Sequence, residues 1–167
     1  MIAPDLVEPV VGFRAWRLVG GRLMSPYIPC RWEGKVMHAE CWPANRTVMP
    51  SPPVGWLAEP HDSPHPDCQC GVYAYHRPGV QAYYGEWLWT EGVVTVWGRL
   101  EAHRDGFRAE HARIEALAHP PRNEPERRSA VEGAAAALGV PLVPRADLAG
   151  EADRHGAPLP GGMLPQG

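Results

Sequence analysis

Thiol and imidazole side chains gather in one short stretch of the chain. Cys68 and Cys70 lie one residue apart and are followed by Gly71, so two sulfur atoms can face a common point while the glycine lets the backbone turn away without a Cβ clash. A third thiol, Cys41, lies upstream, and His38 is near it in the sequence. Thiolate and imidazole are the ligands that zinc takes in structural sites. The stretch therefore predicts a zinc site.

The fourth ligand of such a site is left open by the residues themselves. A tetrahedral structural zinc needs four ligands from at least two chain segments, and the three thiols named above supply three of them. The candidates for the remaining position are His61, His65, His38 and Cys30. The contrasting interpretation is buried thiols and surface imidazoles without a metal. It is the weaker one, because three Cys and three His crowd into residues 38–70.

Length, charge and cysteine content limit the number of domains, the partners and the compartment that we expect. A chain of 167 residues can bury one sizeable core, which favours one domain with an appendage. Its net charge of −3 gives no overall electrostatic reason to expect nucleic acid or an anionic membrane as partner. Four Cys, with neither an apolar leader nor an apolar run of about 18 residues, predict a cytoplasmic protein with reduced thiols and no membrane partner.

Turn-forming and aromatic residues predict a mainly β fold. The chain has 20 Pro and 18 Gly, and its seven Trp and five Tyr outnumber its two Phe. Strands are predicted at residues 12–19, 22–24, 72–75, 92–100 and 107–112. Gly20-Gly21 and Asp105-Gly106 predict two hairpin turns, with a positive φ at Gly106. The expected fold is a small, loop-rich sheet or barrel stapled by zinc, with a C-terminal α-helix.

The β-rich domain is expected over residues 12–117, after an irregular lead-in. Its proline-rich connection from Pro26 to Pro66 offers few backbone donors, so the metal is expected to hold it in place of hydrogen-bonded ladders. Gly12-Phe-Arg-Ala and Gly106-Phe-Arg-Ala repeat the same four residues at the start of two β-prone runs. An internal duplication is the less favoured explanation of this repeat.

Residues 118–167 have a different composition. A Pro-rich linker is followed by a helical pattern at about residues 124–138, with Asn123 as a plausible N-cap. From Pro144 onward there is little apolar content and much Pro, Gly and charge. We expect a flexible tail there.

The motif His61-x-x-Pro-x-x-x-Cys68-x-Cys70-Gly-x-Tyr-Ala, with Cys41 upstream and Val96-Trp-Gly-Arg and Gly106-Phe-Arg-Ala-Glu downstream, resembles a family of small bacterial Cys/His proteins, mainly actinobacterial. The resemblance covers Gly12 to Leu117. It implies Cys41, His61, Cys68 and Cys70 as the metal ligands, with His65 and His38 as alternatives. It implies no established activity, and Cys30 lies outside the shared pattern.

An enzymatic zinc site is the main alternative. His38-Ala-Glu40 and the later Pro66-Asp-Cys68-Gln-Cys70 are similar to the zinc deaminase signature, in which a His and two Cys bind zinc and a Glu moves protons. That signature needs Cys-x-x-Cys at a helix start, which this chain lacks. A catalytic zinc also keeps one position open, and three Cys with one His would close it.

Binding is the function that remains, through an aromatic surface. The candidates for a partner-facing patch are Tyr83, Tyr84, Trp87 and Trp89, although these rings could equally fill the core. We therefore expect a non-catalytic binding or adaptor protein with a structural zinc, and another protein as partner. A zinc-dependent hydrolase or deaminase-like enzyme is the alternative. Single-stranded nucleic-acid binding is third, and it rests on Arg99, His103, Arg104, Arg108 and Arg113 with Trp97 and Phe107.

Overall fold

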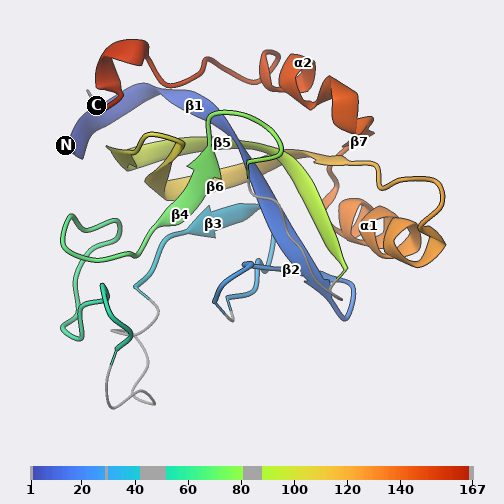
Figure 1. Cartoon of the computed structure of the whole chain (residues 1–167), viewed down its shortest axis with the longest axis horizontal. Coiled ribbons are helices and arrows are strands. Elements are labelled where there is room, and N and C mark those ends of the chain that lie inside the picture. Colours follow the sequence, from blue (N-terminus) through green and yellow to red (C-terminus); the bar gives the residue numbers. More distant parts are fainter. Residues whose placement is uncertain (1, 29, 42–51, 81–87, 166–167) are drawn as a thin grey trace.

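The structure is a computed structural model that describes residues 2–28, 30–41, 52–80 and 88–165 (Figure 1). Its strands are β1 (Ile2–Val19), β2 (Arg22–Met24), β3 (Val36–His38), β4 (Val72–Tyr75), β5 (Trp89–Ala102), β6 (Gly106–Ala118) and β7 (Leu142–Val143). Its helices are α1 (Pro125–Leu138) and α2 (Leu148–Ala152), with 3₁₀ turns η1 (Arg145–Asp147) and η2 (Gly161–Met163). The mainly β fold class with a C-terminal helix is confirmed. No helix of the described part has the length and apolar content to cross a membrane.

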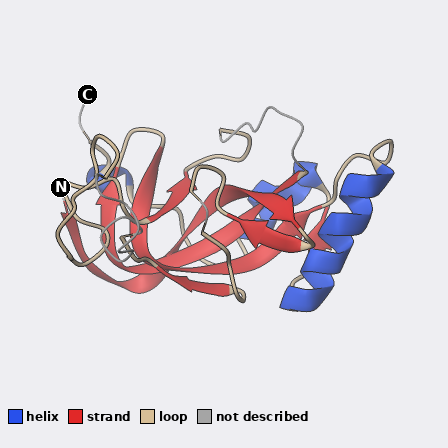
Figure 2. Ribbon diagram, turned by 90° about the horizontal axis from the view of Figure 1, so that it is seen from below, coloured by secondary structure: helices blue, strands red, loops and turns tan. Residues whose placement is uncertain are grey.

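The sheet is built around the hairpin of β5 and β6. β5 pairs antiparallel with β1 on one side and with β6 on the other. β4 pairs with β6 over four residues and touches β1 through Phe13 and Tyr75, so the pairings among β1, β5, β6 and β4 close on themselves. β3 pairs with a later part of β6. In Figure 2, α1 lies against one end of the strand layer, away from the two chain ends.

A nearly continuous run of apolar residues explains why the central hairpin is buried. Val93, Val94, Val96 and Leu100 of β5 are fully buried, so both faces of this strand are covered, as the sequence predicted. Burial of each such side chain contributes about 1.5–3 kcal/mol. The two predicted hairpins are confirmed by the antiparallel β1–β2 and β5–β6 pairings. The central hairpin therefore supplies the rigid frame on which the loops are held.

The expected irregular lead-in is wrong, because β1 begins at Ile2 and pairs with β5 along its length. The prolines that argued against a strand are accommodated by shifts of register. One shift lies between Ala3 and Leu6, and another between Leu6 and Val10. Pro4 and Pro9 fall within these two intervals, where a missing backbone N–H interrupts no regular ladder.

The C-terminal segment is more structured than the sequence indicated. α1 lies where it was predicted, but its N-cap residue is Glu124 rather than Asn123. Beyond Pro144, the chain forms η1 and α2, and Leu148 is fully buried in a cluster with Val11 and Phe13. Sparse apolar content hid this packing, because the segment is held by a few isolated apolar residues, with Ala152 and Leu159 buried as well as Leu148.

The role expected for Gly106 is wrong, since this residue does not adopt a positive φ. β5 ends at Ala102 and β6 begins at Gly106, so the hairpin loop consists of the three residues between them. Glycine is needed there because of a close strand contact. A Cβ at position 106 would lie 2.1 Å from the carbonyl oxygen of Ala74 in β4.

Gly106→Ala is therefore expected to destabilise the fold by at least about 2 kcal/mol, because β4 must move away from β6. Denaturant unfolding followed by circular dichroism measures this loss. Gly133→Ala is the matched control, since a Cβ at that helical position meets nothing within 4 Å. It is expected to stabilise α1 by up to about 1 kcal/mol. Equal stabilities of the two variants would contradict the steric explanation.

Candidate metal centre

Cys41, His61, Cys68 and Cys70 come together in the structure. One donor atom from each residue lies within 4.8 Å of all the others, and the three thiols are buried while the imidazole is partly buried. Cys41 follows β3, and the other three lie in the loop that leads to β4. The four side chains are close enough to hold one metal ion.

The separations within two pairs of donor atoms are close to those of a tetrahedral site. The Sγ atoms of Cys41 and Cys68 are 3.7 Å apart, and the Sγ of Cys70 is 3.4 Å from Nε2 of His61. Bond lengths of about 2.3 Å to sulfur and about 2.0 Å to nitrogen, at tetrahedral angles, require about 3.8 Å and 3.5 Å between these pairs of atoms. These two separations, with all other pairs of donor atoms within 4.8 Å, are compatible with one tetrahedral metal ion.

The imidazole of His61 is oriented by a backbone carbonyl. Its Nδ1 lies 2.6 Å from the oxygen of Glu59, and because a carbonyl oxygen only accepts, Nδ1 must carry the proton. The unprotonated Nε2 then faces the thiols. A second hydrogen bond of this kind commonly fixes the tautomer and the ring angle of a metal-binding histidine.

The two thiols of the Cys-x-Cys turn have different environments. For Cys68, burial raises the pKa, but hydrogen bonds from the backbone of Leu57 and Cys70 and with the side chains of Cys41 and Cys70 together outweigh it and lower the pKa to about 7. The Leu57 N–H donates to the Cys68 Sγ over 3.4 Å. For Cys70, burial dominates and raises the pKa. The thiolate, which is the form that binds metal, is thus more favoured at Cys68 than at Cys70.

The alternative ligands make other contacts instead of joining the cluster. His65 packs its ring edge-on to that of His61, with centroids 5.1 Å apart, and its Nδ1 accepts the N–H of Asp67. His38 lies in β3, where its Nδ1 is 2.7 Å from Nδ1 of His111. These two histidines, like Cys30, are not part of the four-residue cluster.

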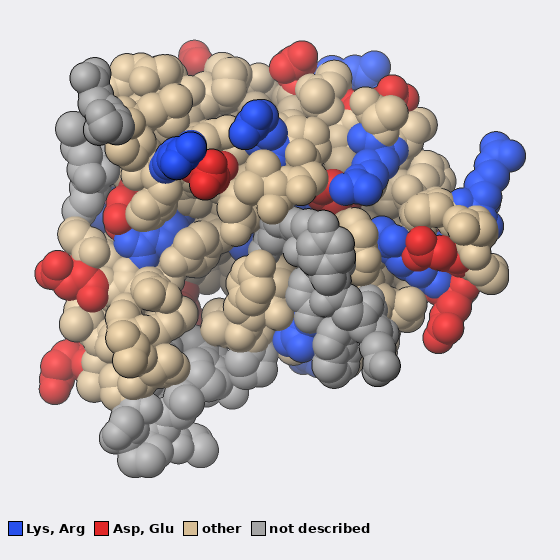
Figure 3. All heavy atoms as spheres, viewed as in Figure 1, with Lys and Arg blue, Asp and Glu red and all other residues tan. Residues whose placement is uncertain are grey.

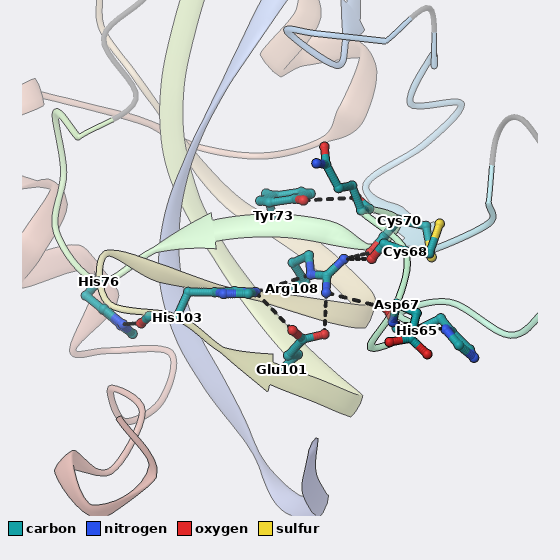
Figure 4. Close-up of polar contacts among 10 residues, drawn as sticks. His65, Asp67, Cys68, Cys70, Tyr73, His76, Glu101, His103 and Arg108 are labelled. Carbon is teal, nitrogen blue, oxygen red and sulfur yellow. Dashed lines mark hydrogen bonds and ion pairs between the residues drawn. The ribbon is translucent and has the colours of Figure 1, made fainter. Parts of the chain in front are cut away.

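Arg108 ties the metal loop to the sheet (Figure 4). This β6 side chain is 4% exposed, and its NH1 donates to the backbone oxygens of both Cys68 and Cys70. Its NH2 forms an ion pair with Glu101, and its Nε donates to Nε2 of His103 over 3.2 Å. One buried guanidinium therefore fixes the turn that carries two of the four metal ligands.

The expected basic hairpin for nucleic acid is not an open cationic surface. Arg108 and Phe107 are buried, while Arg99 pairs with Glu110 and Arg113 with Glu115. On the face shown in Figure 3, the described basic and acidic side chains are interspersed. Most of the basic side chains that suggested a single-stranded nucleic-acid site are therefore buried or paired with carboxylates of the same chain.

The proposed aromatic patch falls mostly outside the described residues. Tyr83, Tyr84 and Trp87 all lie there, and Trp89 is the first residue of β5. The ring of Trp89 is half-buried, with the guanidinium of Arg127 4.0 Å and that of Arg145 5.6 Å from its centroid. Trp89 therefore has contacts within the chain that account for its presence.

A hollow of about 610 Å³ opens beside the metal cluster, between the loop and the β5–β6 hairpin. Its lining includes Asp67, Cys68, Tyr73, Glu101, His103 and Arg108. Burial lowers the pKa of His103, and the neighbouring Arg108 adds to this effect against the opposing charge of Glu101. Sequence reasoning missed this hollow, because its lining comes from residues far apart in the chain.

Comparison of the chain with protein-family models, with curated proteins and with solved structures found no match. The resemblance to small bacterial Cys/His proteins stays a prediction. The arrangement of Cys41, His61, Cys68 and Cys70 is therefore the observation on which a functional conclusion rests.

Proposed function

We propose that this chain is a non-catalytic binding protein, with a structural zinc ion at Cys41, His61, Cys68 and Cys70. The supporting observation is that the four donor atoms lie within 4.8 Å of one another, and two of their separations are close to those of a tetrahedral zinc site. Three thiolates and one imidazole fill every position of such a site. A closed first shell favours a structural role, because a catalytic zinc keeps one position for water or substrate.

The role of the metal would be to join two segments that have little regular structure. Cys41 lies outside regular structure after β3, and His61 to Cys70 lie in a loop without helix or strand. The cluster forms a small buried group of its own, with Trp56 and Leu57 packed against it. Zinc would supply the cross-link between these segments that a hydrophobic core supplies elsewhere.

Metal analysis of the purified protein tests the proposal. Mass spectrometry of the native protein is expected to show one zinc ion per chain, and a thiol-specific reagent should release it. A protein isolated under reducing conditions without metal, yet fully folded, would contradict a structural zinc. A bound iron in place of zinc would contradict the choice of metal.

A hydrolytic zinc enzyme is the second candidate, because Cys68 lines the hollow that His103 and Glu101 also line. Cobalt substitution separates the two candidates. A centre with four protein ligands is expected to give a tetrahedral cobalt spectrum that azide does not change. A spectral shift on adding azide would show an open position and favour the enzyme.

The partner that we propose is another protein, with a Lys or Arg side chain entering the hollow. The charge of Arg108 is already matched by Glu101, so this pair contributes no net charge. Asp67 is exposed, and three thiolates around one divalent ion leave the centre net negative. A cation is the group that this surface favours.

Asp67→Asn tests the partner through its charge. A short lysine-containing peptide is expected to bind the zinc-loaded protein more tightly than its glutamate counterpart, in fluorescence anisotropy at low salt. The variant should weaken lysine-peptide binding about threefold or more. Glu126→Gln on α1 is the control, since it removes an exposed carboxylate outside the hollow. Equal binding of both peptides would contradict a cationic partner group.

A further inference from the structure

We propose that His38 and His111 form a second metal site, which takes a borderline divalent ion such as Ni²⁺ or Cu²⁺. The two residues are directly opposite each other in the antiparallel pairing of β3 and β6. Their Nδ1 atoms are 2.7 Å apart, and neither residue is part of the Cys/His cluster. Imidazole nitrogen is a preferred ligand of both ions.

The spacing of the two nitrogens favours a tetragonal ion. Two nitrogens at about 2.0–2.1 Å from a metal lie about 2.9 Å apart when they occupy adjacent positions of a square-planar or octahedral ion. In a tetrahedral site they would lie about 3.4 Å apart. The observed 2.7 Å therefore needs only a small opening for the tetragonal geometry. Water molecules complete the coordination, because His38 is exposed.

The carboxylate of Glu110 favours the tautomer of His111 that can bind a metal through Nδ1. Oε1 of Glu110 lies 3.6 Å from Nε2 of His111, which favours the tautomer with the proton on Nε2. Nδ1 of His111 is then unprotonated and faces His38. Glu110 is itself fixed by Arg99, whose backbone N–H and Nε both donate to its Oε2, and this lowers the pKa of Glu110. Carboxylate–histidine pairs of this kind orient metal ligands.

In the absence of metal, the proton on Nδ1 of His38 bridges the two rings. Metal binding requires that this proton move to Nε2 of the same exposed imidazole, which changes the tautomer and not the charge. The divalent ion then occupies the position of the bridging proton. The Nδ1–H bond of His38 breaks and an Nε2–H bond forms through solvent, so the number of protons on the protein does not change.

The neighbouring strand, β5, is irregular beside His38 and His111. β5 has a register shift between Trp97 and Leu100, and Gly98 within it has a φ of +78°. A Cβ at position 98 would lie 2.8 Å from Oε2 of Glu110 and 2.9 Å from the His111 ring. The ring of Trp97 packs on His111, with centroids 5.5 Å apart. Such bulges are frequent beside functional sites, where they make room for or redirect side chains.

Isothermal titration of the zinc-loaded full chain with NiCl₂ tests the site. One Ni²⁺ per chain is expected to bind, while a chromogenic zinc indicator shows no zinc release. His38→Ala and His111→Ala should each weaken binding at least about tenfold, because each removes one of two protein ligands. His76→Ala is the control, since this histidine contacts the backbone of His103 instead.

Two further variants, Glu110→Gln and His38→Asn, test the site independently of the alanine variants. Glu110→Gln should weaken Ni²⁺ binding severalfold without changing its stoichiometry, because Gln cannot hold the same tautomer as firmly. His38→Asn, at an exposed position, keeps the test valid if an alanine variant folds poorly. Wild-type affinity in both His38→Asn and His111→Ala would overturn the proposal. So would release of one zinc per bound nickel, which would place the ion at the cysteine cluster instead.

Discussion

Cys68→Ser is expected to abolish stoichiometric zinc binding and to unfold much of the chain. Structural zinc binding is worth on the order of 10 kcal/mol, comparable to the whole stability of a domain. A loss of even half of this amount should lower the melting temperature by at least about 10 °C in a chain of this size. Differential scanning calorimetry and zinc analysis of the same sample measure the two effects.

Cys30→Ser is the matched control for this prediction, because it replaces the one cysteine outside the cluster. It is expected to keep one zinc ion per chain and to unfold close to the wild-type temperature. Removal of the metal from the wild-type protein by a chelator should reproduce the effect of Cys68→Ser. A metal-free preparation with full thermal stability would contradict both the prediction and the proposed structural role.

The ligand cluster was predictable because its signal is local. Cys68 and Cys70 share one turn, so their types and spacing alone indicate a metal site. Cys41 could be predicted as the third thiol ligand because a structural zinc needs ligands from a second chain segment. The choice between His61 and His65 could not be made from spacing, since it depends on the carbonyl of Glu59 that orients the His61 ring. That contact exists only in the folded loop.

The fold was predictable where periodicity was strong. The run of valines in β5 predicted the central strand, and the hairpin signals gave its neighbours. Two predictions failed because a tertiary contact decided the outcome. Gly106 is required by the approach of β4, and the segment after Pro144 is held by the burial of Leu148 and a few other isolated apolar residues. A single sequence shows neither contact.

The same limit explains why the sequence alone predicts Arg108 on a basic surface. Its neighbours in the sequence include several charged residues, so a solvated or nucleic-acid-facing side chain was the natural interpretation. The one available signal was the repeated Gly-Phe-Arg-Ala, whose two copies lie on the strands that flank β4. Arg14, in the other copy, is also buried and donates to the backbone oxygen of Tyr73.

Arg108→Met is expected to destabilise the protein by about 3–5 kcal/mol, because it leaves the largely buried carboxylate of Glu101 without its partner. It also removes the donor shared by the backbone oxygens of Cys68 and Cys70, so the turn that holds two metal ligands should loosen. We expect zinc to dissociate faster from this variant. Urea unfolding and the rate of zinc transfer to a chelator measure the two consequences.

Arg104→Met is the matched control, since Arg104 is exposed in the loop of the same hairpin, and it should change stability by less than about 0.5 kcal/mol. The double variant Arg108→Met with Glu101→Leu separates the two effects of the buried arginine. It should regain stability relative to Arg108→Met, because no unpaired carboxylate remains, yet it should still release zinc quickly. Zinc release at the wild-type rate in both variants would show that Arg108 stabilises the sheet without holding the metal loop.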